Sequence, residues 1–447
     1  MTLAVITYLL ALFVLGWVIL GFFRQTLGGV ERAGLAYPIG AGIFTLAVFV
    51  AANTGMPITL VSAGVIFAAL LLPCLWFVRQ NHSSLFITLE CPQLELEQII
   101  LIGLVGILVL TAFVGAIYMP PVMWDALSFW VLKAKLMAAT GEIAPQAQAS
   151  WPFYPLNLSL QITFLFLLGG DFLQIVIPVY FLSFLLLFYA NLRQWIGTTL
   201  ALACTLFLGA TPIIQEYAKH AYANLPFAVY YVGSAIYLLR FLKDKKTSWL
   251  VLSGILIGLA SWTRAESLLY LVINLLTLLL FTHFTRTSFK HAFAYLGIYA
   301  IFGFPWNLYS KLSGYDNELS KAALGGLVSL VSGNLNLSLL EHILRYALAS
   351  AQATTTWGLL WPGLLVALLL SIKYWREHAA LLCLLVLNFV SLIYTYYSAS
   401  VTSHNSVDWW LGTGRTNGTT LGTPVGVLYG ISYRDNLSAK RNYRSIS

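Results

Sequence analysis

Apolar segments of about 20 residues recur along the chain, and they constrain its fold more than any other feature of the sequence. A helix of that length crosses roughly 30 Å of hydrocarbon. The runs are continuous and lack the period-two alternation of a membrane barrel, so they predict helices. Hydrophobic residues make up 59% of the 447 and charged residues only 9%, far fewer than in a soluble domain. The sequence therefore predicts an all-α, polytopic membrane protein.

About twelve of these windows are predicted to span the membrane. They lie near residues 2–23, 36–52, 58–78, 98–118, 173–190, 196–213, 222–242, 248–263, 266–284, 292–310, 356–372 and 379–397. The stretch 248–284 fits either two spans or one broken unit. The first window has no basic leader and no small-residue cleavage site, so we expect it to be retained.

The expected domain organisation is one transmembrane domain followed by a tail. Residues 1–411 form the predicted transmembrane domain, with its first large outer loop at 119–172. Residues 412–447 are polar and basic. They are either a native disordered tail or the product of a frame shift near Arg415 that truncates the native end and inactivates the chain.

Basic residues divide unevenly between alternate loops, and this bias predicts the orientation of the chain. The richer set is expected to be cytoplasmic and contains Arg24, Arg32, Arg79, Arg193, Arg240, Lys243, Lys245, Lys246, Arg286, Lys290, Lys373 and Arg376. The loop 119–172 then faces the periplasm or its equivalent, and the protein is placed in the inner (plasma) membrane. The same bias accounts for the net charge of +8, so no nucleic-acid partner is predicted.

The segment from Trp124 to Lys135 places a carboxylate and two ammonium groups directly after a predicted span. Charged groups near lipid are costly, and by default they are candidates for function. At roughly 100° per residue, Leu127 and Trp130 share an apolar stripe nearly opposite Asp125. This pattern predicts a short interfacial helix with its Trp side on the membrane. The alternative is an ordinary juxtamembrane helix capped by Asp125.

Three other outer segments carry polar or aromatic clusters. The segment from Gln215 to Pro226 combines an acid, a base, an imidazole, phenols and an amide, which favours function; His220 is either a proton carrier or a hydrogen-bonded structural residue. Arg264 and Glu266 interrupt two apolar runs, either as an internal pair or as an Arg that awaits a phosphate. The turn 151–156, rich in Pro and aromatic residues, suits either a rim at the headgroups or a simple re-entry turn.

Together and in this order, these motifs resemble the GT-C superfamily of integral-membrane glycosyltransferases. They are similar to its protein mannosyltransferase, aminoarabinose transferase and rhizobial lipopolysaccharide sugar-transferase groups. The resemblance covers roughly residues 118–270 and rests on Asp125 with Trp130 and Lys135, Tyr154-Pro155-Leu156, Tyr222 to Pro226, and Gly258 to Glu266. The chain departs from the pattern at Asn224, Arg264 and Ser267, where relatives often have an acid, Lys and Gly. It also has one acid at position 125, not an adjacent pair.

The resemblance implies inverting transfer of a sugar from a polyprenyl-phosphate-linked donor to a lipid, glycan or protein acceptor outside the membrane. Asp125 would activate the acceptor hydroxyl as general base. The donor phosphate would be held by Lys133 or Lys135 together with Arg264. The sugar and acceptor pocket would contain Tyr154, Glu216, Lys219, His220, Asn224 and Glu266. No metal ligand is predicted and no cofactor is named, which leaves a divalent cation open.

Two other classes of function compete with this interpretation. A transporter or lipid flippase would be expected to show repeated halves and charges near the membrane midplane. Here no repeat is found and the charges gather at the outer edge, which favours an enzyme. A catalytically dead assembly subunit is the third alternative. The chain has no Walker loop, GxGxxG fingerprint or HExxH motif, so ATP-driven, Rossmann-type and metallopeptidase chemistry have no support.

Overall fold

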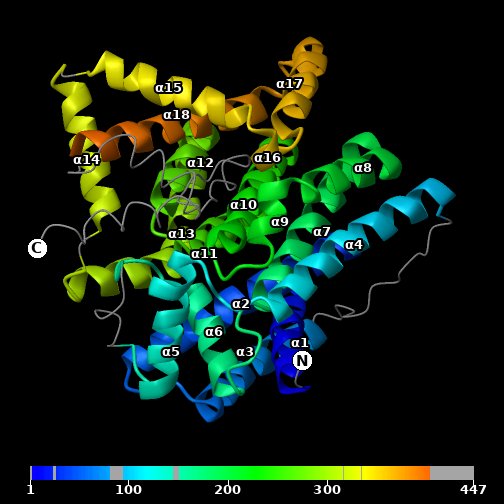
Figure 1. The fold of residues 1–447 in the computed structure, drawn as a ribbon, viewed down its shortest axis with the longest axis vertical. Helices are drawn as coiled ribbons and strands as arrows, with labels where there is room; N and C mark the ends of the chain where they lie inside the picture. The colour runs from blue at the N-terminus through cyan, green and yellow to red at the C-terminus, as the bar shows by residue number, and fades with distance from the viewer. Residues whose placement is uncertain are drawn as a thin grey trace, which may run out of the picture.

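The structure is a computed structural model that describes residues 3–23, 27–80, 94–143, 151–315, 317–333 and 335–402. Within these ranges every regular element is a helix, which confirms the predicted all-α class (Figure 1). The predicted tail 412–447 lies outside the described residues, as does Arg415.

The first part of the chain contains long helices followed by the short helices of the first outer loop. They are α1 (Leu3–Ile19), η1 (Leu20–Phe23), α2 (Gly29–Asn53), α3 (Leu60–Gln80), α4 (Leu96–Tyr118), η2 (Ala126–Trp130), α5 (Val131–Thr140) and α6 (Asn157–Leu167).

The remaining helices differ widely in length. They are α7 (Val176–Ile196), α8 (Thr198–Gly209), α9 (Pro212–Tyr217), α10 (Asn224–Asp244), α11 (Thr247–Ser261), α12 (Ser267–Phe281), α13 (Arg286–Leu312), α14 (Glu318–Val331), α15 (Leu337–Ala351), α16 (Thr354–Trp357), α17 (Leu360–Ser371), η4 (Ile372–Tyr374) and α18 (Ala379–Thr402).

Seven helices of the described chain are long and apolar enough to cross a membrane, so the expected count of about twelve is not reached. These seven are α1 with η1, α2, α3, α4, α7, α10 and α18. Helices do form at the other predicted windows. However, α8 and α17 have 12 residues, and α11 and α12 have 15. At roughly 1.5 Å per residue, these helices are shorter than the hydrocarbon layer.

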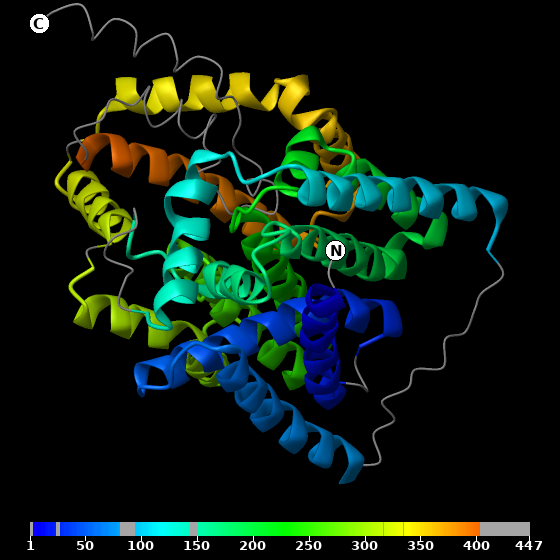
Figure 2. The same cartoon turned by 60° about the horizontal axis from the view of Figure 1, so that its bottom comes forward.

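Helices α2 and α10 lie at the centre of the bundle (Figures 1 and 2). In their most apolar windows 72% of α2 and 78% of α10 is buried, whereas for α3 and α4 the share is 11%. The outer pair therefore presents most of its apolar side chains to the surroundings. Helix α1 crosses α2 closely because Gly16 and Gly40 meet; a Cβ at either position would fall 1.8 Å from a carbonyl oxygen of the other helix.

The last helices form a more open group, away from α1 and α2. Helix α18 packs against α14, α15 and α12, and α15 runs beside it in both views (Figures 1 and 2). The expected outer loop is partly helical, since α5 and α6 pack on each other and α6 packs on α2. This packing carries the first outer loop onto the centre of the bundle.

Candidate functional site

Asp125 lies in a helix that continues as α5 and contains one widened, π-helical turn, η2. The Asp125 side chain makes no capping hydrogen bond, so the capping alternative is not observed. Trp130 is buried in protein with 1% exposed, whereas Leu127 is 49% exposed. The predicted apolar stripe with its Trp side on the membrane is therefore wrong. The projection assumed 100° per residue throughout, and a π-helical turn breaks that register.

The Asp125 carboxyl is buried, with 7% of the residue exposed. No donor among the described residues is hydrogen-bonded to its carboxylate oxygens. Burial raises the pKa of Asp125 to about 7; the nearby Arg264 guanidinium opposes this shift, and the Glu266 carboxylate adds to it. A carboxyl with that pKa exchanges its proton near neutral pH, as a general base requires.

Arg264 lies in the short turn between α11 and α12, and its guanidinium binds the Glu266 carboxylate through two hydrogen bonds. Its Nε donates to Glu266 Oε2 at 3.1 Å, and its Nη2 donates to Oε1 at 2.7 Å. Its Nη1 donates to Asn224 Oδ1 at the start of α10. The pair corresponds to the predicted internal ion pair, and the Arg is not an unneutralised cation. One N–H on each Nη nitrogen is not used by these three bonds.

Tyr154 and Lys133 connect the first outer loop to this ion pair. The Tyr154 hydroxyl donates to Glu266 Oε1 at 2.9 Å, and Arg264 lies over the Tyr154 ring at 5.6 Å. The buried Lys133 ammonium donates to the carbonyls of Trp151, at 2.9 Å, and Tyr154, at 3.1 Å. Burial lowers the pKa of Lys133 to about 7. Lys133 is therefore hydrogen-bonded to the backbone of the turn that carries Tyr154.

A buried network of polar side chains holds the turn that carries Arg264. Asn157 Nδ2 donates to Thr263 Oγ1 at 2.8 Å, and Thr45 Oγ1 donates to Asn157 Oδ1 at 2.8 Å. Trp262 Nε1 in turn donates to Thr45 Oγ1 at 3.0 Å. All four side chains are buried. Satisfied networks of this kind fix a single arrangement of the helices that they join, here α2, α6 and the end of α11.

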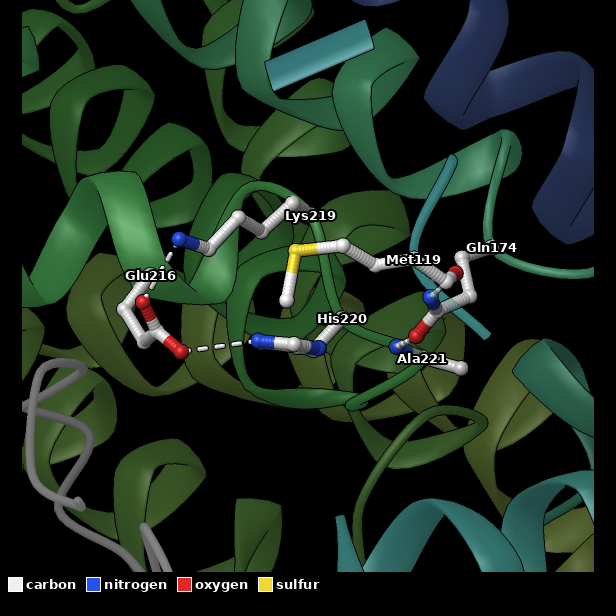
Figure 3. Close-up of polar contacts among 6 residues, drawn as sticks. All are labelled: Met119, Gln174, Glu216, Lys219, His220 and Ala221. Atoms are coloured by element: carbon white, nitrogen blue, oxygen red, sulfur yellow. Dashed lines mark hydrogen bonds and ion pairs between the residues drawn. The ribbon is translucent and has the colours of Figure 1, made fainter. Parts of the chain in front are cut away.

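Glu216, Lys219 and His220 form a second cluster (Figure 3). Glu216 Oε2 accepts from Lys219 Nζ at 2.8 Å, and its Oε1 lies 2.7 Å from His220 Nε2. The hydrogen bond with His220 and the contact with Lys219 outweigh burial and lower the pKa of Glu216 to about 2. The Glu216 carboxylate is therefore ionised across the physiological range and is a weaker base than an ordinary carboxylate.

The structure brings together five of the ten predicted site residues: Asp125, Tyr154, Asn224, Arg264 and Glu266. Glu216, Lys219 and His220 form their own cluster, and Lys135 is exposed. Two tyrosines join the first group and were not predicted. The backbone of Asp125 faces the Tyr222 hydroxyl, and Tyr217 contacts Asn224. Their signal in the sequence was their place inside the polar segment 215–226.

The site combines a carboxyl that titrates near neutral pH with a guanidinium that has N–H groups not used by its bonds to Glu266 and Asn224. Such a pair can accept a proton from a hydroxyl while donating hydrogen bonds to an anionic leaving group. In the described ranges, no group of three or more His, Cys, Asp or Glu side chains is placed to hold a metal ion.

Comparison with known proteins finds a similarity to one protein family in part of the chain. Residues 154–308 match the model of the dolichyl-phosphate-mannose-protein mannosyltransferase family. No curated protein and no solved structure matches the chain. The matched segment covers about a third of the chain; it includes Tyr154, the cluster of Glu216 and the Arg264 turn, and it begins after Asp125. Together with the apolar helices, this match supports a multi-pass membrane glycosyltransferase of the GT-C type.

Proposed function

We propose that this protein transfers a sugar from a polyprenyl-phosphate-linked donor to a hydroxyl group of a lipid, glycan or protein acceptor. The observation that carries the proposal is the buried Asp125 carboxyl, whose pKa is raised to about 7, beside the Arg264–Glu266 pair. In this scheme Asp125 takes the proton of the acceptor hydroxyl, and the hydroxyl oxygen attacks the anomeric carbon from the side opposite the phosphate. The sugar–phosphate bond breaks, inverting the anomeric carbon and releasing the lipid phosphate.

Arg264 is assigned to the leaving phosphate. Each Nη nitrogen has one N–H that its three bonds to Glu266 and Asn224 do not use, and a planar guanidinium suits phosphate oxygens better than an ammonium group does. The Glu266 carboxylate and Asn224 keep the guanidinium in place before substrate arrives, so little reorganisation is needed during the reaction. Tyr154 fixes Glu266 in turn. The reaction takes place on the outer face in this proposal, consistent with the bias of the basic residues.

The test is sugar transfer in membranes that contain the protein, with a synthetic polyprenyl-phosphate sugar as donor and envelope glycans and lipids as acceptors. Replacing Asp125 with Asn keeps the size of the side chain and removes the base, so transfer should fall about 100- to 10,000-fold. Asp171→Asn is the matched control, because Asp171 is an exposed acid that precedes α7. Unchanged transfer by Asp125→Asn, at equal protein level, would remove Asp125 from the mechanism.

A further inference from the structure

The direction of the Asp125 carboxylate depends on its backbone. Among the described residues no hydrogen bond holds the carboxylate itself, and η2 follows it immediately. Whatever fixes the segment between the end of α4 and Asp125 therefore fixes the candidate base. That segment begins at Met119, where α4 ends and the Met119 N–H still donates to the Gly115 carbonyl at 2.9 Å.

Gln174, in the turn that precedes α7, joins this segment to a second loop (Figure 3). Its Nε2 donates to the Met119 carbonyl at 2.7 Å, and its Oε1 accepts from the Ala221 N–H at 3.0 Å. Gln174 is 1% exposed, so neither bond competes freely with water. Only a side chain that donates at one end and accepts at the other can make both bonds.

The two loops that Gln174 joins carry the two halves of the candidate site. Met119 begins the segment that leads to Asp125, whereas Ala221 directly precedes Tyr222 and the start of α10. At that start, Asn224 holds the Arg264 guanidinium. The amide of Gln174 thus sets the spacing between the base and the residue that orients Arg264.

A second contact at the same junction involves the half-buried cluster of Glu216, Lys219 and His220. The Lys219 stem lies against Gly115 of α4, where an added Cβ would stand 3.0 Å from Lys219 Cδ. Glu216 holds the Lys219 ammonium at 2.8 Å, and the Met119 side chain lies between Lys219 and His220 in Figure 3. Through both contacts the end of α4 packs against the loop that precedes α10.

We propose that Gln174 is a positioning residue for the transfer reaction, which holds the Asp125 segment in register with the Arg264 side of the site. This inference rests on the proposed function, because it assumes that Asp125 is the base. Gln174 touches neither substrate nor the reacting atoms in this scheme. It acts through the two backbone groups that it joins.

The experiment replaces Gln174 with Met, which keeps the length and removes both hydrogen bonds, and with Glu, which loses the donor to the Met119 carbonyl. Gln194→Met is the matched control, because among the described residues the Gln194 side chain donates a local bond to the Ala190 carbonyl within α7 and joins no second segment. We expect kcat to fall roughly 10- to 100-fold in both Gln174 variants, since displacements of about 1 Å can cost that much. KM for the donor should change less than twofold, and the control should match the native protein.

The second measurement separates positioning from general damage. Infrared difference spectra, each taken as one protein minus the same protein with Asp125→Asn, follow the Asp125 carboxyl band as pH is changed. They need no catalysis. Burial is the largest cause of the raised pKa of Asp125, so a loosened segment should shift the midpoint of this band to lower pH in Gln174→Met. A lower kcat with an unmoved midpoint, or an unchanged kcat, overturns the inference. Full activity of Asp125→Asn overturns the proposed function instead.

Discussion

The two ionic clusters near the outer loops use similar residues and reach opposite electrostatic states. Around Arg264 the partners are buried, with 7% and 11% of the Arg264 and Glu266 side chains exposed. Around Lys219 they are half-buried, with 27% and 24% exposed for Lys219 and Glu216. The pKa of Asp125 rises to about 7 in the first cluster, while that of Glu216 falls to about 2 in the second. The pKa of a carboxyl rises toward neutral pH when burial outweighs the attraction of nearby cations, and it falls when those cations outweigh burial.

Removing one cation from each cluster tests this contrast most strongly. Arg264→Gln leaves the Glu266 carboxylate buried without its partner, so unfolding free energy should fall by about 3–5 kcal/mol. Lys219→Gln leaves Glu216 with water and His220, and should cost no more than about 1 kcal/mol. Both values are obtained from reversible unfolding in detergent micelles. Equal losses in the two variants would contradict the difference in burial.

The pH dependence of transfer tests which carboxyl is the base. If Asp125 must be ionised, the rate should rise with pH through a midpoint of about 7, and at pH 5 it should be roughly 100-fold below its plateau. Initial rates between pH 5 and 9 measure this limb. Glu216→Gln should keep the same midpoint, because Glu216 is ionised throughout that range. A midpoint near pH 4 would show that the base is not the buried carboxyl.

The thermal stability of Asp125→Asn tests the raised pKa directly. As pH rises from about 4 to about 7, Asp125 ionises in the unfolded chain before it does so in the folded protein, so the native protein loses stability. Asn does not ionise and carries no such loss. The variant should therefore melt at a higher temperature than the native protein at pH 8 and at the same temperature near pH 4. A variant that is less stable at both pH values would show that the carboxylate stabilises the fold.

The smallest expected effect is the acid sensitivity of the second cluster. The pKa of Glu216 is lowered in the folded protein, so its contribution to stability is present above about pH 4.5 and is lost as pH falls toward 2. Melting curves of Glu216→Gln and the native protein should therefore converge in that acid range. At neutral pH their difference should stay within about 1 kcal/mol. Convergence at a higher pH would mean that the His220 contact does not hold Glu216 ionised.

Hydropathy located the helices well, because each predicted window coincides with a helix or a pair of short helices. It placed the break between α11 and α12 at the Arg264 turn, but it could not predict the lengths of other helices, since α2 and α13 extend beyond the windows 36–52 and 292–310. The polar character of the site was visible in Asp125, Arg264 and Glu266. Their grouping depends on contacts between distant segments, which periodicity does not encode.

Three residues show that a local sequence pattern does not determine the surroundings of a side chain. Lys133 and Lys135 are equivalent in sequence terms, yet one is buried against two carbonyls and the other is exposed. The sequence does not mark Gln174 as a site residue, because a single amide in a loop has no distinguishing neighbours. Its importance follows only from the two backbone groups that it reaches.

The π-helical turn at Ala126–Trp130 has a consequence for how this site can change over evolutionary time. A widened turn accommodates one residue more than the regular helix around it. Losing one residue inside this turn would close it to a regular helix and leave the segments on either side in their present relation. Losing one residue from the regular helix that follows would instead rotate everything before the gap by roughly 100° relative to everything after it. The direction of the Asp125 carboxyl therefore depends on where along this helix a residue is lost, and the widened turn is the place where the helix tolerates a change in length.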